Sequence, residues 1–217
     1  MNFDKVRIAI CMPARDMLHS ACCYSLYNLA NKLTELGIVN KLFLSPGTLI
    51  ANQRHELVLA AKEWSATHVM FIDSDIEFQP EHVLNLLEFD EQIVGAAYSK
   101  RVEPIITTAW HSIDNWNSYI RPEEQTDSHI TVEAMALGFC LIKTDVFDKL
   151  ELPWFQLGFY NNQYTGEDIE FFRQCNEKKI PIWLDVQTTC ELGHVGVKNY
   201  KVVDDIEVTL STSNSIG

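Results

Sequence analysis

The sequence predicts an α/β fold, in which a mostly parallel central sheet carries helices on both faces. Short apolar runs, typical of buried strands, alternate with amphipathic helical stretches along the first part of the chain. The length of 217 residues fits one medium domain, and no linker or internal repeat divides it. We therefore expect a single domain over residues 1–210, followed by a small, polar tail at residues 211–217.

Three strands and two helices are expected at the start of the chain. The first strand is predicted over residues 6–12, because this run is apolar and ends at Pro13. Apolar runs at residues 39–44 and 69–72 predict the next two strands. Between the strands, apolar side chains recur on one helical face. The first face consists of Cys22, Leu26, Leu29, Leu33 and Leu36, and Gly37 follows it as a C-terminal cap. The second face consists of Ile50, Leu57, Ala61 and Trp64.

A third helix is expected to begin at Pro80, since proline is tolerated in a first helical turn. The periodicity is then lost between residues 100 and 129, which predicts a long functional loop. The other predicted elements are strands at residues 93–98, 105–109, 130–142 and 182–186, and helices at residues 144–150 and 166–178.

The charge balance is strongly acidic. Seventeen Lys and Arg against thirty Asp and Glu give a formal net charge of −13. Nucleic-acid binding is not expected, because such surfaces depend on basic side chains that contact phosphates. For the same reason, a ligand that carries phosphate would need something besides the net charge to hold it.

Apolar runs in the chain stop after a few residues, whereas a membrane helix needs about 20. The N-terminal segment lacks the apolar core and cleavage site of a secretory signal. The six cysteines include no C-x-x-C pair, so most are expected to be buried thiols rather than zinc ligands or disulfides. These features predict a cytoplasmic protein without a membrane span, located in the host cytoplasm if the chain is viral.

Two carboxylates, Asp73 and Asp75, directly follow the third predicted strand, with Ser74 between them. In an extended chain they share a face, and like charges this close resist joint ionisation unless a cation intervenes. Mg²⁺ and Mn²⁺ prefer oxygen ligands and bridge diphosphates. A solvated turn is the alternative, but ligands of parallel sheets gather at the carboxyl ends of strands, which favours a metal site.

This order of elements and motifs resembles the glycosyltransferase A fold, a Rossmann-like architecture, over roughly residues 6–200. It is most similar to the compact sugar transferases of large viruses, phages and bacteria. In that family a D-x-D motif at the end of a central strand holds a divalent metal against the diphosphate of a nucleotide sugar. The other matching stretches stand in the family's order and are residues 49–54, 94–100, 137–142, 166–168 and 193–196.

The resemblance implies roles for individual residues. The divalent cation, Mn²⁺ or Mg²⁺, would be held by Asp73, Asp75 and His194. The catalytic pair that faces the sugar and the acceptor would be Glu167 and Asp168. The nucleotide sugar would contact Pro13, Ala14, Arg15, Arg54, Asp73, Ser74, Lys100 and Gly138.

Each of these roles has a simpler alternative. His194, taken alone, is an ordinary loop histidine, although neutral imidazole is an acceptable Mn²⁺ ligand. The acids at 167 and 168 also fit the start of a helix, in a capping box with Thr165 as the N-cap. The loop aromatics Trp110, Trp116 and Tyr119 fit stacking on an acceptor sugar and simple packing equally well.

We therefore expect a metal-dependent hexosyltransferase that moves a sugar from a UDP-sugar, or secondly a GDP-sugar, to a hydroxyl of a glycan or glycoprotein. If the reaction inverts configuration, Asp168 or Glu167 would deprotonate the acceptor hydroxyl, and if it retains configuration the pair would position the sugar. Two other classes stay open. One is a haloacid-dehalogenase-like phosphatase with Asp73 as nucleophile, and the other is a non-catalytic nucleotide-sugar-binding protein.

Overall fold

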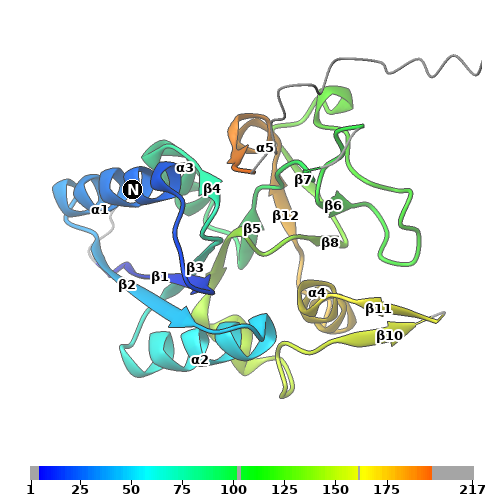
Figure 1. Ribbon diagram of the computed structural model, residues 1–217, viewed down its shortest axis with the longest axis horizontal. Helices are drawn as coiled ribbons and strands as arrows, with labels where there is room; N and C mark the ends of the chain where they lie inside the picture. Colours follow the sequence, from blue (N-terminus) through cyan, green and yellow to red (C-terminus); the bar gives the residue numbers. More distant parts are fainter. Residues whose placement is uncertain (1–4, 102–103, 161, 197–217) are drawn as a thin grey trace, which may run out of the picture.

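A seven-stranded sheet runs through the centre of the computed structural model, which describes residues 5–101, 104–160 and 162–196 (Figure 1). Its strand order is β2-β1-β3-β9-β5-β12-β7. Strands β1, β2, β3, β5 and β12 run in one direction, whereas β7 and β9 run in the other, so the sheet is mostly parallel, as the sequence predicts. The strands are β1 (Arg7–Ala14), β2 (Val39–Pro46), β3 (His68–Ile72), β5 (Ile93–Gly95), β7 (His129–Thr131), β9 (Phe139–Lys143) and β12 (Trp183–Asp185).

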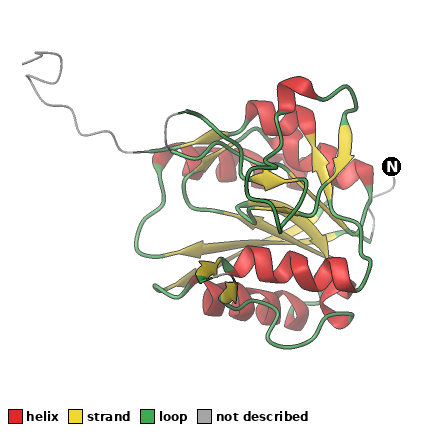
Figure 2. Ribbon diagram, turned by 90° about the vertical axis from the view of Figure 1, so that its right-hand side faces the viewer, coloured by secondary structure: helices red, strands yellow, loops and turns green. Residues whose placement is uncertain are grey.

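Helices cover both faces of this sheet, as Figure 2 shows from the side. In β1, the side chains of Ile8, Ile10 and Met12 pack in one apolar cluster with α1 and α3. The alternate side chains, Ala9 and Cys11, pack in a second cluster with α2 and α4. This division follows from the two-residue period of a strand. The helices are α1 (Ser20–Glu35), α2 (Ile50–Glu63), α3 (Pro80–Phe89), α4 (Glu167–Glu177) and the short α5 (Val186–Glu191).

The predicted helical faces are largely confirmed. Cys22, Leu26, Leu29 and Leu33 of α1 are buried, whereas Leu36 lies just beyond the helix and is 43% exposed. The cap residue Gly37 has a φ of +72°, a left-handed conformation that glycine adopts without steric cost. Pro80 begins α3, as expected.

Pro13 lies inside β1 and does not end it, so the expected boundary is wrong. Its partner on β2 is Ser45, while on the other side the pairing of β1 with β3 stops at Cys11. The missing N–H of proline therefore removes no hydrogen bond to β3. The strand continues to Ala14, which brings that residue to the carboxyl edge of the sheet.

Residues 130–142, predicted as one strand-like stretch, form parts of three strands in different places. β7 lies at one edge of the main sheet, and β9 lies in its centre between β3 and β5. Between them, β8 (Ala134–Met135) pairs with β6 (Ala109–Trp110) in a separate two-stranded sheet. An apolar run alone does not show where the backbone changes its partner, so the sequence missed both breaks.

The predicted strand at residues 93–98 is shorter than expected and ends at Gly95. Beyond this point the backbone bonds to other partners: the N–H of Ala97 donates to Thr189 Oγ1 and that of Tyr98 to Thr108 Oγ1. The segment stays buried and leads directly to the candidate site.

Short elements complete the fold. The helix predicted at residues 144–150 is a 3₁₀-helix over Thr144–Asp148, and a second 3₁₀-helix covers Pro122–Glu124. Two small antiparallel sheets border the main one. Their strands are β4 (Ile76–Glu77) with β13 (Gly193–His194), and β10 (Gly158–Tyr160) with β11 (Gln163–Thr165).

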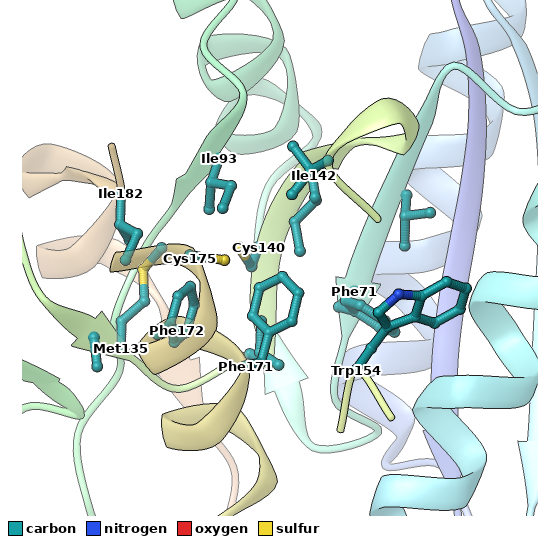
Figure 3. Close-up of a cluster of buried hydrophobic side chains, with 14 of the residues drawn as sticks. Phe71, Ile93, Met135, Cys140, Ile142, Trp154, Phe171, Phe172, Cys175 and Ile182 are labelled. Atoms are coloured by element: carbon teal, nitrogen blue, oxygen red, sulfur yellow. The ribbon is translucent and has the colours of Figure 1, made fainter. Parts of the chain in front are cut away.

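An aromatic core fixes α4 against the sheet (Figure 3). Phe171 of α4 stacks on Phe155, with ring centroids 5.2 Å apart, and Phe155 packs edge-on against Phe71 of β3 at 5.8 Å. Phe172 and Cys175 are also fully buried. Since buried aromatic packing tolerates little displacement, the N-terminus of α4 is held at the carboxyl edge of the sheet.

The six cysteines, all within the described residues, are free, and four of them are buried, in line with the prediction. None of the helices in the described part of the chain combines the length and apolar character that crossing a membrane requires. The predicted tail at residues 211–217 lies outside the described residues.

Candidate active site

His194 lies beside Asp75 because β13 pairs with β4. In this pairing His194 is opposite Ile76, the residue that follows Asp75, and the N–H of Val195 donates to the Asp75 carbonyl at 2.8 Å. As a result, Nε2 of His194 lies 3.6 Å from Oδ2 of Asp75. The structure therefore brings together two of the three residues predicted to bind a metal.

The other ring nitrogen of His194 is fixed by the backbone. Nδ1 lies 2.7 Å from the carbonyl oxygen of Ser99, which can only accept a hydrogen bond, so Nδ1 carries the proton. In the neutral ring the lone pair is then on Nε2, which faces Asp75. Metal-binding imidazoles are commonly oriented in this way by a carbonyl behind them.

Two side chains, those of Arg101 and His194, contact Asp75. Arg101 donates from Nη2 to its Oδ2 at 2.8 Å and from Nη1 to the Val195 carbonyl at 3.0 Å. Burial alone would raise the pKa of Asp75, but the bonds from His194 and Arg101 lower it below its ordinary value. The same contact with Asp75 raises the pKa of His194. The carboxylate is therefore ionised at neutral pH and would be a competent ligand for a cation.

Asp73, the third predicted ligand, has different partners. Its Oδ1 accepts from Nη2 of Arg54 at 3.1 Å, and its Oδ2 accepts from the hydroxyl of Tyr98 at 2.9 Å. Burial and the negative charge of Asp73 raise the pKa of Tyr98 well above its ordinary value, so this hydroxyl keeps its proton. Residues 5–101, 104–160 and 162–196 contain no group of three or more His, Cys, Asp or Glu side chains arranged to hold a metal.

Arg54 connects Asp73 to Glu167. Its side chain is buried, and its guanidinium donates from Nε to Oε1 of Glu167 at 3.0 Å and from Nη1 to the Leu137 carbonyl at 3.4 Å. Burial opposes the charge of Arg54, but the two carboxylates outweigh this effect and raise its pKa. Arg54 thus forms a buried bridge between two acids at the edge of the sheet.

Gly138 is required where Asp73 and Tyr98 meet. A β-carbon on Gly138 would lie 2.3 Å from Oδ2 of Asp73 and 2.3 Å from the Tyr98 hydroxyl, far inside van der Waals contact. Its carbonyl also accepts from the N–H of Asp73 at 2.9 Å. The space that a β-carbon would occupy is therefore filled by the side chains of Asp73 and Tyr98.

Glu167 and Asp168 begin α4 but have different surroundings. Glu167 is paired with Arg54, whereas Asp168 lines a cavity and its Oδ1 accepts only from its neighbour Ile169 among the hydrogen bonds of the described residues. Burial and the negative charge of Glu167 raise the pKa of Asp168 to about 6. Asp168 is therefore the member of the pair suited to accept a proton near neutral pH.

The capping box with Thr165 as the N-cap, which was the alternative role of these acids, is not formed. Gly166 is the N-cap of α4 and makes no side-chain cap bond, while the Thr165 hydroxyl donates to Glu170 at 2.6 Å. The acids at the start of α4 still lie at the positive end of its dipole. Their position is set by the Arg54 bridge and by the aromatic core beneath them.

The loop that leaves β1 lies next to the D-x-D loop. The N–H of His19 donates to the Ser74 carbonyl at 3.0 Å, and Gln53 donates to the Ala14 carbonyl at 3.3 Å. Pro13 and Ala14 are buried, whereas the side chain of Arg15 is 73% exposed and pairs with Asp16 at 3.4 Å. The predicted donor-binding residues on these two loops are therefore neighbours, as parallel strands require.

A cavity of about 710 Å³ adjoins the carboxylates and contains both Lys100 and Asp168. Nζ of Lys100 lies 5.2 Å from the centre of the Trp110 ring, which also lines this cavity together with Trp116. Ser99, the residue before Lys100, holds His194. The cavity and the His194–Asp75 pair are thus joined by one short segment of chain.

The sequence did not single out Tyr98 or Arg101 as functional. Both lie at or just beyond the carboxyl end of the predicted strand at residues 93–98, close to the D-x-D loop in space. A search of every polar residue that follows a predicted parallel strand would have found them. The β10–β11 hairpin gave no comparable signal, since its place over the cavity depends on α4.

No protein-family model and no curated protein matches the chain. The solved structure of A197 from STIV aligns with 82% of this chain and 81% of its own, at 17% identity and a TM-score of 0.52. The structure of a glycosyltransferase involved in the glycosylation of the major capsid of PBCV-1 aligns with 68% of each chain, at 14% identity and a TM-score of 0.38. The chain thus shares its fold with A197, and the second alignment is too weak to bear on function.

Proposed function

We propose that this protein is a metal-dependent glycosyltransferase that moves a sugar from a nucleotide diphosphate sugar to a hydroxyl of a glycan. The observation that carries this proposal is the pair formed by His194 and Asp75 at the carboxyl end of β3. One nitrogen of the ring is bonded to a backbone carbonyl, and the other lies 3.6 Å from the carboxylate. A carboxylate and an imidazole together would suit Mn²⁺ better than Mg²⁺, which prefers oxygen ligands alone.

The donor site of the proposed enzyme lies along the carboxyl edge of β1 and β3. A UDP-sugar is favoured and a GDP-sugar comes second, both from the family that the motifs resemble. With a net charge of −13, the chain offers few cations to a diphosphate, and within residues 5–101, 104–160 and 162–196 the exposed arginines at this edge are Arg15 and Arg101. A divalent cation held by Asp75 and His194 would neutralise the leaving diphosphate as the glycosidic bond breaks.

Asp168 is the proposed catalytic carboxylate. Because Glu167 is held by Arg54, Asp168 is the acid that faces the cavity from the start of α4. In an inverting reaction it would take the proton of the acceptor hydroxyl, and in a retaining one it would position the sugar. Its raised pKa, about 6, is close to the range in which a general base works best.

The phosphatase alternative fits the site less well. Each oxygen of Asp73 accepts a hydrogen bond, from Arg54 at 3.1 Å and from Tyr98 at 2.9 Å, which makes this carboxylate a weaker nucleophile. A non-catalytic sugar-nucleotide binder would need no carboxylate with a raised pKa in its cavity. Asp168 therefore favours the transferase over both.

Donor binding is the first test. We expect Mn²⁺ together with UDP or a UDP-sugar to raise the melting temperature of the wild-type protein, since a ligand of the native state stabilises it. Asp75→Asn and His194→Ala should abolish the Mn²⁺-dependent part of this rise. His111→Ala, at an exposed histidine outside the site, is the matched control and should keep it.

Hydrolysis of the bound donor is the second test. We expect slow, Mn²⁺-dependent release of UDP by the wild-type protein and its loss in the folded Asp75→Asn variant. The proposal is wrong if no UDP- or GDP-sugar binds in the presence of Mn²⁺, or if Asp75→Asn hydrolyses the donor at the wild-type rate. A phosphoryl adduct on Asp73 would support the phosphatase instead.

A further inference from the structure

The cavity beside Asp168 has aromatic walls. Its volume, about 710 Å³, lies within the range of roughly 300–1,000 Å³ found for small-molecule sites. The walls come from Lys100 and residues 110–116, from the β10–β11 hairpin and from α4. Its aromatic side chains are Trp110, Trp116, Phe159, Tyr160 and Tyr164.

Most of these rings are open to solvent. Trp116 is 42% exposed, Phe159 57% and Tyr164 79%. Single exposed aromatics are ordinary, but several around one cavity form the kind of surface that marks a binding site. The rings also hold one another: Trp110 and Trp116 pack edge-on at 5.4 Å, and Phe159 and Tyr164 pack at 4.9 Å. Flat faces are thus presented in fixed orientations.

The charges that line the cavity balance. Two are positive, Lys100 and Arg173, and two are negative, Asp114 and Asp168. Nη1 of Arg173 lies 3.6 Å from Oδ1 of Asp114, and its guanidinium lies 4.4 Å from the centre of the Tyr160 ring. A nucleotide or another polyanion would therefore meet no surplus of positive charge here. A neutral ligand with many hydrogen-bonding groups fits better.

The outer wall of the cavity is held by a buried carboxylate. Glu170 of α4 is 3% exposed and accepts from the Thr165 hydroxyl at 2.6 Å and from the Tyr160 hydroxyl at 3.0 Å. These two donors lie on β11 and β10, so one side chain ties both strands of the hairpin to the helix. The aromatic wall is therefore in place before a ligand binds, which lowers the entropy cost of binding.

We propose that this cavity binds a neutral saccharide, with sugar rings stacked on Trp116 and Tyr164 and hydroxyls bonded to the charged side chains between them. A sugar ring has apolar C–H faces and polar edges, which match flat aromatic walls interrupted by charges. The bound saccharide is the acceptor of the proposed transferase, and its hydroxyl reaches Asp168. The role of the saccharide as the acceptor rests on the proposed function, whereas saccharide binding itself does not.

Saturation-transfer NMR with the full chain tests the proposal. The probes are the methyl glycosides of glucose, galactose and mannose, maltotriose and cellotriose, with uridine and UMP as nucleotide probes. Each is measured in the absence and in the presence of UDP and Mn²⁺. The variants are Trp116→Ala and Tyr164→Ala, and the matched control is Tyr27→Ala, an aromatic on α1 that is 65% exposed. Circular dichroism confirms that each variant is folded.

We expect at least one saccharide to bind the wild-type protein and Tyr27→Ala equally. Each cavity variant should bind it about tenfold more weakly, a loss of roughly 1.4 kcal/mol. The proposal is overturned if no saccharide binds, if both cavity variants bind as tightly as wild type, or if uridine or UMP is the probe that these variants weaken. If the protein hydrolyses the donor but binds no saccharide, the saccharide site is wrong and the proposed transferase function stands. If it binds a saccharide but no donor, the transferase function is wrong and the saccharide site stands.

Discussion

Nε of Arg54 lies 3.0 Å from Oε1 of Glu167, a residue 113 positions further along the chain. The same guanidinium bonds to Asp73, so one buried side chain joins the loop after β3 to the start of α4. This bridge neutralises Asp73 and Glu167, whose pairing with Arg54 is not evident from the sequence. It leaves Asp168 as the acid of the pair that faces the cavity.

Arg54→Met should destabilise the fold strongly. Removing the guanidinium leaves Asp73 and Glu167 without their partner in a poorly solvated place, which costs about 3–5 kcal/mol. Urea unfolding measures the free energy directly. Arg101→Met is the control: this arginine is 47% exposed, so its loss should cost less than about 1 kcal/mol. A loss below about 1 kcal/mol for Arg54→Met would show that the bridge is not structural.

Gly138→Ala should disable donor binding. The added methyl group would lie 2.3 Å from Asp73 Oδ2 and from the Tyr98 hydroxyl, so both must move. We expect a loss of about 1–3 kcal/mol in stability and a failure of UDP with Mn²⁺ to raise the melting temperature. Gly37→Ala, which strains the backbone after α1 without any contact within 4 Å, should lose stability but keep donor binding. Unchanged donor binding in both variants would contradict the prediction.

The stability of the protein should depend on Asp168 and pH. Its pKa in the folded state is about 6, above the ordinary value of 3.8, so the folded state binds more protons between these values. The stability that protonated Asp168 provides is fully present below about pH 4 and is lost as the pH rises through about 6. Asp168→Asn cannot ionise and should therefore be more stable than wild type at about pH 8, with the difference vanishing near pH 4. Melting curves across this range check the sign, and a difference that grows on acidification would refute it.

The rate of sugar transfer should also depend on Asp168, but here the ionised form of the carboxylate is the one required. A general base must be ionised, so the rate of sugar transfer to a hydroxyl acceptor should fall as the pH drops through about 6. Asp168→Asn should lose transfer at every pH while still binding UDP with Mn²⁺. Glu167→Gln tests the assignment within the pair: it should keep transfer, and the pH at which the rate falls should move lower, because the negative charge of Glu167 helps to raise the pKa of Asp168. If Asp168→Asn keeps the wild-type rate, Asp168 is not the base.

Glu170→Ala should loosen the β10–β11 hairpin. The Thr165 hydroxyl, which is 6% exposed, would lose its acceptor, at a cost of about 1–3 kcal/mol. Amide hydrogen exchange of residues 158–160 and 163–165 should become faster, and saccharide binding weaker. Glu177→Ala, at an exposed glutamate of the same helix, should change stability by less than about 0.5 kcal/mol. Unchanged hairpin exchange in Glu170→Ala would show that this carboxylate does not hold the wall.

The sequence predicted the regular part of the fold well because local patterns carry it. The helical face of α1 and the proline that begins α3 are local signals, and both are confirmed. The prediction of one strand-like stretch at residues 130–142 was wrong, because the sequence of a buried apolar strand does not show which strand it pairs with. The antiparallel place of β9 at the centre of the sheet depends on long-range pairing.

The candidate site shows the same division. The sequence by itself determined the position of the D-x-D carboxylates at the end of a buried strand, since strand polarity and hydrophobic pattern fix it. Only the tertiary structure decided that Asp75 pairs with His194, that Arg54 and Tyr98 hold Asp73, and that Asp168 rather than Glu167 faces the cavity. These choices depend on hydrogen bonds between segments far apart in the chain, and on burial that no single segment can show.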